Sequence, residues 1–173
     1  MENLSIVASQ WCKLHLGVDA DTHEIVAVEL TPDDVGDVAE LPNLLDQIDA
    51  DVASMTADGA YDGQVVYDAV AERHPKASVI VPPRITAVAS ETTTSQRGEH
   101  LTTITVYGRT SWQRSSGYNR RSLVETAMFR YKTLIARRLH ARILPNQRTE
   151  AKLGCNVLNR MTGLGMPISI RIR

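Results

Sequence analysis

Asp58 is a candidate for metal or substrate chemistry because of its place in the sequence. It follows an apolar run, residues 52–57, and precedes Gly59. In open α/β sheets, ligands bind beyond the carboxyl ends of the strands. A carboxylate there could hold a metal ion, or it could form a turn by binding its own backbone. Asp62, a second carboxylate nearby, is expected to be a helix N-cap.

Glu125 is the second candidate, as the only acidic residue in the stretch 109–149. At ~100° per residue on a helix, Tyr118, Arg121, Glu125 and Lys132 share a polar stripe about 60° wide at the border of an apolar arc. One interpretation is an ion pair between Arg121 and Glu125 at positions i and i+4. The other is a metal-binding carboxylate flanked by phosphate-binding cations.

The functional interpretations of Asp58 and Glu125 are consistent with a single type of reaction. Cleavage and transfer of a phosphodiester strand use divalent ions, held by carboxylates, that activate the attacking oxygen and stabilise the leaving one. Basic residues would bind the phosphate backbone. Trp112, just ahead of the predicted helix, could stack on an exposed base or be an aromatic residue of a small core.

Charge is divided unevenly along the chain, although the 173 residues carry a formal net charge of only −1. Residues 1–108 hold five basic and 18 acidic residues, a formal charge of −13. Residues 109–173 hold 14 basic and two acidic residues, a formal charge of +12. Such asymmetry favours nucleic-acid binding by the basic part. The alternative is two solvated faces of opposite sign that attract each other.

The elements that must position these residues can be predicted from apolar periodicity. Residues 12–18 alternate as a half-buried strand, and residues 25–30 form a second strand of the same hairpin. Asp37 and Glu40 have capping-box spacing ahead of a helical stripe of leucines. Further along, the pattern predicts a strand at 52–57, a helix at 65–72 and a strand at 78–81.

The second half is predicted to be helical after an irregular stretch. Residues 85–117 read as a loop or small insertion, with a strand at 101–106 as one option. A long helix is predicted over 118–143 and a shorter one over 146–161. The order of elements favours an α/β fold with a mixed sheet.

Several protein classes are excluded. No apolar run approaches the ~18 residues of a membrane span, and the first residues lack the features of a signal peptide. Two cysteines make neither a disulfide framework nor a four-ligand zinc site. We therefore expect a cytoplasmic protein without a membrane partner.

The spacing Tyr118-x2-Arg121-x3-Glu125-x6-Lys132 resembles the Y-R-E-K signature of the DDE transposases of bacterial insertion sequences. Residues 13–19, 57–62 and 158–161 with 164–167 agree with this resemblance, which extends from about residue 11 to the C-terminus. It implies an RNase H-like fold, in which helices flank a mixed sheet, and DNA strand cleavage and transfer that depend on Mg²⁺ (or Mn²⁺).

The resemblance also implies roles for individual residues. Asp58 corresponds to the second and Glu125 to the third acidic residue of the catalytic, metal-binding triad. Tyr118, Arg121 and Lys132 correspond to the members of the signature that contact DNA and phosphate. The implied partner is the DNA of the transposon ends.

One departure from the family pattern concerns the first catalytic Asp, which the family carries on a strand ahead of the hairpin. Residues 1–11 contain no Asp, and Asp19 lies in the hairpin turn. We therefore expect an unstructured stretch or a remnant leader at 1–11 and a partial, N-terminally truncated domain at 12–173 that lacks the first strand. Its open sheet edge would favour a homo-oligomer or pairing with a full-length transposase.

Three hypotheses follow from the sequence. The chain is a transposase by descent that is inactive alone, or a non-catalytic fragment that binds DNA and regulates. The third hypothesis is an α/β domain whose oppositely charged halves merely neutralise each other, or an unstable pseudogene product.

Overall fold

The computed structural model describes residues 11–87 and 95–165. The predicted hairpin is confirmed, with β1 (Cys12–Val18) antiparallel to β2 (Ile25–Pro32). The Asp19 carboxylate shapes the turn by accepting the backbone N–H groups of Asp21 and Thr22 at 2.9 and 2.7 Å. These short-range bonds explain why the hairpin could be predicted from local sequence.

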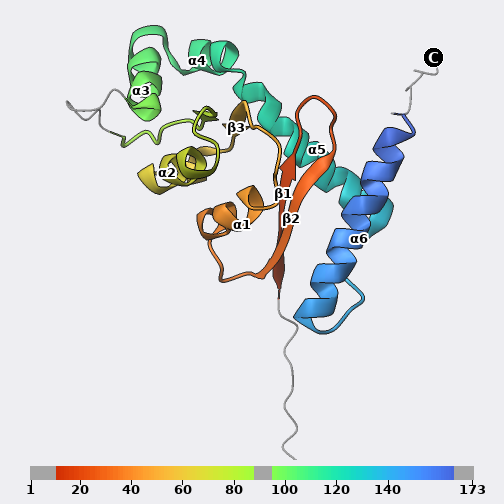
Figure 1. Ribbon diagram of the computed structural model, residues 1–173. Helices are drawn as coiled ribbons and strands as arrows, with labels where there is room; N and C mark the ends of the chain where they lie inside the picture. Colours follow the sequence, from red (N-terminus) through yellow and green to blue (C-terminus); the bar gives the residue numbers. More distant parts are fainter. Residues whose placement is uncertain (1–10, 88–94, 166–173) are drawn as a thin grey trace, which may run out of the picture.

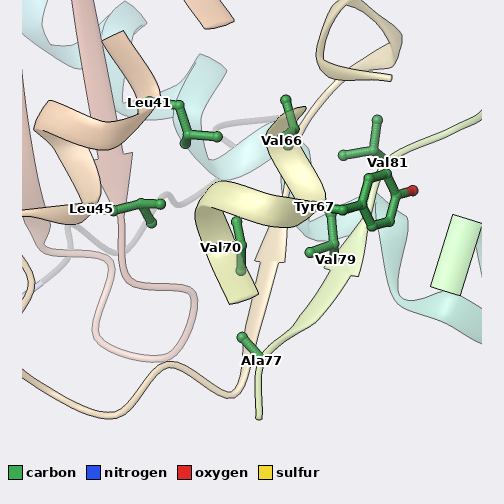
Figure 2. Close-up of a cluster of buried hydrophobic side chains, with 8 residues drawn as sticks. All are labelled: Leu41, Leu45, Val66, Tyr67, Val70, Ala77, Val79 and Val81. Carbon is green, nitrogen blue, oxygen red and sulfur yellow. The ribbon is translucent and has the colours of Figure 1, made fainter. Parts of the chain in front are cut away.

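A second, parallel pair of strands is formed by β3 (Ser54–Thr56) and β4 (Ser78–Ile80). The chain crosses between them through η2 (Gly59–Tyr61) and α2 (Gln64–Arg73). Figure 2 shows the apolar side chains that α2, β4 and α1 (Leu41–Leu45) bury together. Those side chains are Leu41, Leu45, Val66, Tyr67, Val70, Ala77, Val79 and Val81.

The prediction of one mixed sheet is wrong in detail for the described residues. The four strands form two separate two-stranded sheets, β1–β2 and β3–β4. We call the parts around them the hairpin lobe and the parallel lobe. The fold is α/β, with helices packed around both sheets (Figure 1).

The predicted capping box at Asp37 and Glu40 is also wrong. These residues form the 3₁₀ turn η1 (Asp37–Glu40), and no side chain caps it or α1. Asp37 instead pairs with Lys13 of β1 at 3.5 Å, and Glu40 accepts a hydrogen bond from Asn43 at 2.8 Å. For Asp37, an ion pair with a residue of another element replaces the expected local cap.

The stretch 85–117 contains two helices rather than an irregular segment with a strand. They are α3 (Gln96–Tyr107) and α4 (Arg109–Ser116), which meet at Gly108, whose φ of 81° suits glycine. The threonines that favoured a strand bond backward along the helix, as Thr105 does to the Leu101 carbonyl at 2.8 Å. The Ser95 hydroxyl caps α3 by accepting the Gly98 N–H at 3.2 Å.

The helical segment predicted over 118–143 ends earlier than expected and combines three types of helix. A 3₁₀ turn η3 (Tyr118–Arg121) leads into α5 (Ser122–Arg130), and a π turn η4 (Tyr131–Ile135) ends the helical segment. The chain after Ile135 is instead tied to α6 (Leu144–Gly163), because the Glu150 carboxylate accepts backbone N–H groups of residues 140 and 141. None of the helices in the described ranges is long and apolar enough to span a membrane.

The hairpin lobe is completed by α5 and α6, which lie beside the hairpin (Figure 1). Its core brings Ile25 and Val28 of β2 against residues far along the chain, namely Ala127, Tyr131, Cys155 and Leu158. The second helix of the prediction is thus confirmed, and its buried face anchors the hairpin.

Side chains close the outer edge of each sheet. On β2, Asn159 bonds both the N–H and the carbonyl of Ile25 at 2.8 Å, and Gln47 accepts the Val28 N–H at 3.0 Å. On β4, Gln96 accepts the Val79 N–H at 2.7 Å. Such amide groups satisfy an edge as a neighbouring strand would.

The second edge of each sheet, on β3 and on β1, differs from the edges on β4 and β2. Within the described ranges, no strand or side chain bonds the edge of β3 that faces away from β4. The same holds for the edge of β1 that faces away from β2, from Lys13 to Val18.

Candidate active site

Asp58 lies in a turn directly after β3. It is the N-cap of η2, and its Oδ1 accepts the Ala60 N–H at 2.9 Å. The Tyr61 N–H donates to the Asp58 carbonyl at 3.1 Å. The turn-forming role that the sequence left open is therefore present, and the exposed carboxylate is held in one orientation.

Asp62 is not a helix N-cap, contrary to the sequence prediction. Gly63 is the N-cap residue of α2, and the Asp62 side chain is fully buried. Its carboxylate accepts Nε and Nη2 of Arg97 at 2.6 and 3.1 Å, and the Arg84 backbone N–H at 2.8 Å. Burial alone would raise the pKa of Asp62, but the bonds from Arg97 and Arg84 outweigh it and lower this pKa.

The four signature residues lie on η3, α5 and η4. Arg121 Nη2 pairs with Glu125 Oε1 at 2.8 Å, and the Arg121 guanidinium lies 5.8 Å from the centre of the Tyr118 ring. The Glu125 side chain is 61% exposed and that of Arg121 is 34% exposed. The ion pair that the sequence left open is thus present, and both groups remain accessible to a ligand.

Lys132 is exposed and lies in the π turn η4. The predicted stripe assumed a regular helix throughout, and this assumption fails at both ends of the segment. The 3₁₀ and π turns change the rotation per residue, so the ~100° step holds only within α5.

Trp112 is a core aromatic residue rather than an exposed base-stacking platform. It is 1% exposed, and its indole N–H donates to His100 Nδ1 at 3.0 Å. The Tyr118 ring lies 5.5 Å from it, and the His100 ring meets it edge-on at 5.3 Å. Because His100 Nδ1 accepts, the proton belongs on Nε2, which faces the Val79 carbonyl at 2.8 Å.

The two candidate segments meet in space. β3, which leads into Asp58, contacts η3, which begins with Tyr118 (Figure 1). No hydrogen bond or ion pair joins Asp58 to Glu125 within the described ranges. Nor do these ranges hold a group of three or more acidic, His or Cys side chains arranged to bind a metal.

Arg97 and His100 are site-supporting residues that sequence reasoning missed. They lie one turn apart on α3, in the stretch that was read as irregular. The available signal was Ser95, a favoured N-cap residue. The partner of Arg97 is Asp62, 35 residues back along the chain, and the partner of His100 is Trp112, 12 residues ahead. Pairs so far apart produce no local sequence pattern.

The two oppositely charged halves of the chain touch through exposed ion pairs. Arg120 pairs with Asp21 at 3.1 Å, and Lys152 pairs with Glu29 at 3.2 Å. Exposed pairs of this kind contribute about 0–1 kcal/mol each. Mutual attraction of the halves is therefore real but weak.

Comparison with known proteins identifies a family for this chain. The sequence model of the transposase DDE domain matches residues 8–160, which is most of the chain. No solved structure matches the chain.

Proposed function

Since the chain belongs to the transposase DDE domain family, we propose that it binds transposon-end DNA and supplies part of a strand-transfer site. The observation that carries this proposal is the contact between β3 and η3, which brings the Asp58 turn beside the Tyr118 segment. The signature spacing supports assignment to the Y-R-E-K group of insertion-sequence transposases.

Asp58 and Glu125 are the proposed metal-binding carboxylates. Both are exposed oxygen donors, which is the chemistry that Mg²⁺ and Mn²⁺ prefer. A bound divalent ion would activate a hydroxyl oxygen for attack on phosphorus and stabilise the oxygen that leaves. The chain's own part is to orient these carboxylates, Asp58 through the Ala60 N–H and Glu125 through Arg121.

Tyr118, Arg121 and Lys132 are the proposed DNA contacts. Arg121 is held between the Tyr118 ring and Glu125, so its guanidinium is already ordered at the surface. An ordered guanidinium presents planar donors that match phosphate oxygens. Lys132 adds a further exposed cation in η4, at the other end of α5.

The proposed sheet is RNase H-like and takes one more strand than the described residues contain. The open edges of β1 and β3 support this, because the outer edges of β2 and β4 are closed by side chains. The resemblance implies that this central strand carries the first catalytic Asp. We infer that the chain alone does not cleave DNA.

DNA cleavage by the purified chain tests the inferred incompleteness. We expect no nicking of transposon-end DNA with Mg²⁺ or Mn²⁺ by the chain alone. Nicking by the wild type that Glu125→Ala abolishes and Glu99→Gln leaves intact would overturn it, because it would show a complete site.

A DNA-binding measurement tests the other part of the proposal, that the chain binds DNA. It also bears on the second candidate function, which is a non-catalytic fragment that binds DNA. That candidate is favoured by the +12 formal charge of residues 109–173. Affinity should fall with salt, with a log–log slope of about −0.9 for each phosphate neutralised. Arg121→Ala should weaken binding, whereas Asp58→Ala and Arg73→Ala, on α2 of the parallel lobe, should not. Salt-independent binding would contradict the proposal.

A further inference from the structure

Helix α3 contacts Asp62 and Trp112, the residues that hold the Asp58 turn and the Tyr118 segment in place. Arg97 reaches the turn of Asp58 through the buried Asp62 carboxylate. His100, one turn along the same face of α3, accepts the indole N–H of Trp112, and the Tyr118 ring lies against Trp112 at an interplanar angle of 39°. We propose that α3 is a positioning helix for the strand-transfer site, with Arg97 and His100 as its positioning residues.

The Asp58 side of this arrangement is a closed unit of five residues. The turn from Asp58 to Asp62 is held together by bonds from Tyr61 N–H and Asp62 N–H to carbonyls at its start. At the far end, three donors bind the Asp62 carboxylate, two from Arg97 and one from the backbone of Arg84. Because the turn is so short, fixing Asp62 also fixes the Ala60 N–H that orients Asp58.

Charge supports the same conclusion. A buried carboxylate is costly unless it is paired, and a two-pronged guanidinium is the partner that fixes its plane as well as its place. The Arg97 side chain is itself only 27% exposed, so water competes weakly for this pair. The pair therefore acts as a rigid link between the turn and α3.

The Tyr118 side is linked by ring contacts. His100 bonds the Val79 carbonyl of β4 and the Trp112 indole with its two nitrogens, which fixes the position of α3 against the sheet. Trp112 then presents its ring to Tyr118, whose ring lies under Arg121. Arg121 in turn holds Glu125 at 2.8 Å. One helix thus sets where both carboxylates stand.

This inference rests on the proposed function for its purpose, but its geometry can be tested separately. Amide hydrogen exchange by NMR should report the link at the Ala60 N–H. We expect Arg97→Gln to speed exchange there by about tenfold or more, because the charged bonds from Arg97 to the Asp62 carboxylate are lost. Arg97→Lys should speed exchange less. Exchange in β1 and β2 should not change. Glu99→Gln, on an exposed position of α3, is the matched control.

The second arm uses His100→Phe, which keeps a ring beside Trp112 and removes both hydrogen bonds. Exchange of the Trp112 indole proton should rise by about tenfold, and Trp112 fluorescence should shift in a Trp11→Phe background. If Arg97→Gln does not fold, Arg97→Lys decides the first arm, because it keeps the charge and loses the two-pronged geometry. Unchanged exchange at Ala60 and at Trp112 would overturn the positioning role.

Mn²⁺ alone separates the positioning role from the proposed metal site. In the wild type and in Glu99→Gln, Mn²⁺ should broaden the Ala60 amide resonance, and Asp58→Asn should remove this effect. Arg97→Lys should reduce the broadening by at least about threefold without unfolding the protein, because the Asp58 carboxylate loses its fixed aim. If Mn²⁺ has no effect even on the wild type, the metal proposal fails, and the exchange arms still decide the positioning role.

Discussion

The Asp58 turn and the Tyr118–Lys132 segment are supported in opposite ways. The turn is anchored by a fully buried carboxylate with three donors. The segment carries its charges at the surface, where Arg121 and Glu125 pair in contact with water. A buried pair resists rearrangement, whereas an exposed pair exchanges partners at little cost. The turn therefore provides fixed geometry, and the segment provides cations that a phosphate can recruit.

The largest expected effect is at the buried anchor of the turn. Asp62→Ala leaves Arg97 and the Arg84 N–H without their acceptor and should destabilise the protein by about 3–5 kcal/mol. Urea unfolding measures this loss. Asp46→Ala is the control, since its ion pair with Arg73 is largely exposed and should contribute less than about 1 kcal/mol. Equal losses in the two variants would remove the contrast between buried and exposed support.

A smaller loss is expected where the segment packs on α6. A Cβ added at Gly154 would lie 2.7 Å from the Tyr131 ring and 2.9 Å from Ile135 Cγ2, so Gly154→Ala should cost about 1–3 kcal/mol. It should also shift the π turn that carries Lys132. Gly163→Ala, where a Cβ meets nothing within 4 Å, is the control in thermal unfolding. A neutral Gly154→Ala would mean that the π turn does not depend on this close packing.

Acid should weaken the turn by titrating Asp62. Its pKa in the folded protein is lower than the ordinary 3.8, so the stabilisation it provides is complete above about pH 4 and is lost as pH falls through the folded pKa. Chemical unfolding from pH 6 to pH 3 should show this loss in the wild type and a shallower one in Asp62→Asn. Parallel pH curves for the two proteins would show that Asp62 is not the titrating anchor.

The smallest effect on stability is expected at Glu125. Glu125→Gln removes an exposed i,i+4 ion pair and should change the free energy of unfolding by less than about 0.5 kcal/mol. DNA affinity should not fall, because Arg121 keeps its charge and its contact with the Tyr118 ring. A loss of several kcal/mol would mean that the segment is supported as firmly as the turn.

Local sequence patterns predicted the elements that are stabilised locally. The hairpin followed from alternation and an Asp turn, and the parallel lobe lies in one stretch whose leucines and valines form a core among themselves. Asp58 was placed correctly at the end of a strand, and the pairing of Arg121 with Glu125 was anticipated from their spacing.

Not every prediction that failed did so for the same reason, and some depended on distant partners. Asp62 read as a cap because Arg97 lies 35 residues away, and the helix over 118–143 read as continuous because nothing local marks the break after Ile135. The threonines of α3 gave a strand-like pattern, and bonds to their own helix carbonyls offset that preference. Long-range pairing such as that of Asp62 with Arg97 cannot be read from periodicity.

The closure of the β2 edge by Asn159 has a consequence for synthesis of the chain. The hairpin leaves the ribosome well before α6, so the Ile25 end of the β2 edge and the apolar face under α6 stay uncovered until residue 159 has emerged. The parallel lobe can complete its core long before that point. We therefore expect vectorial folding in which the nascent hairpin is the segment most in need of a chaperone.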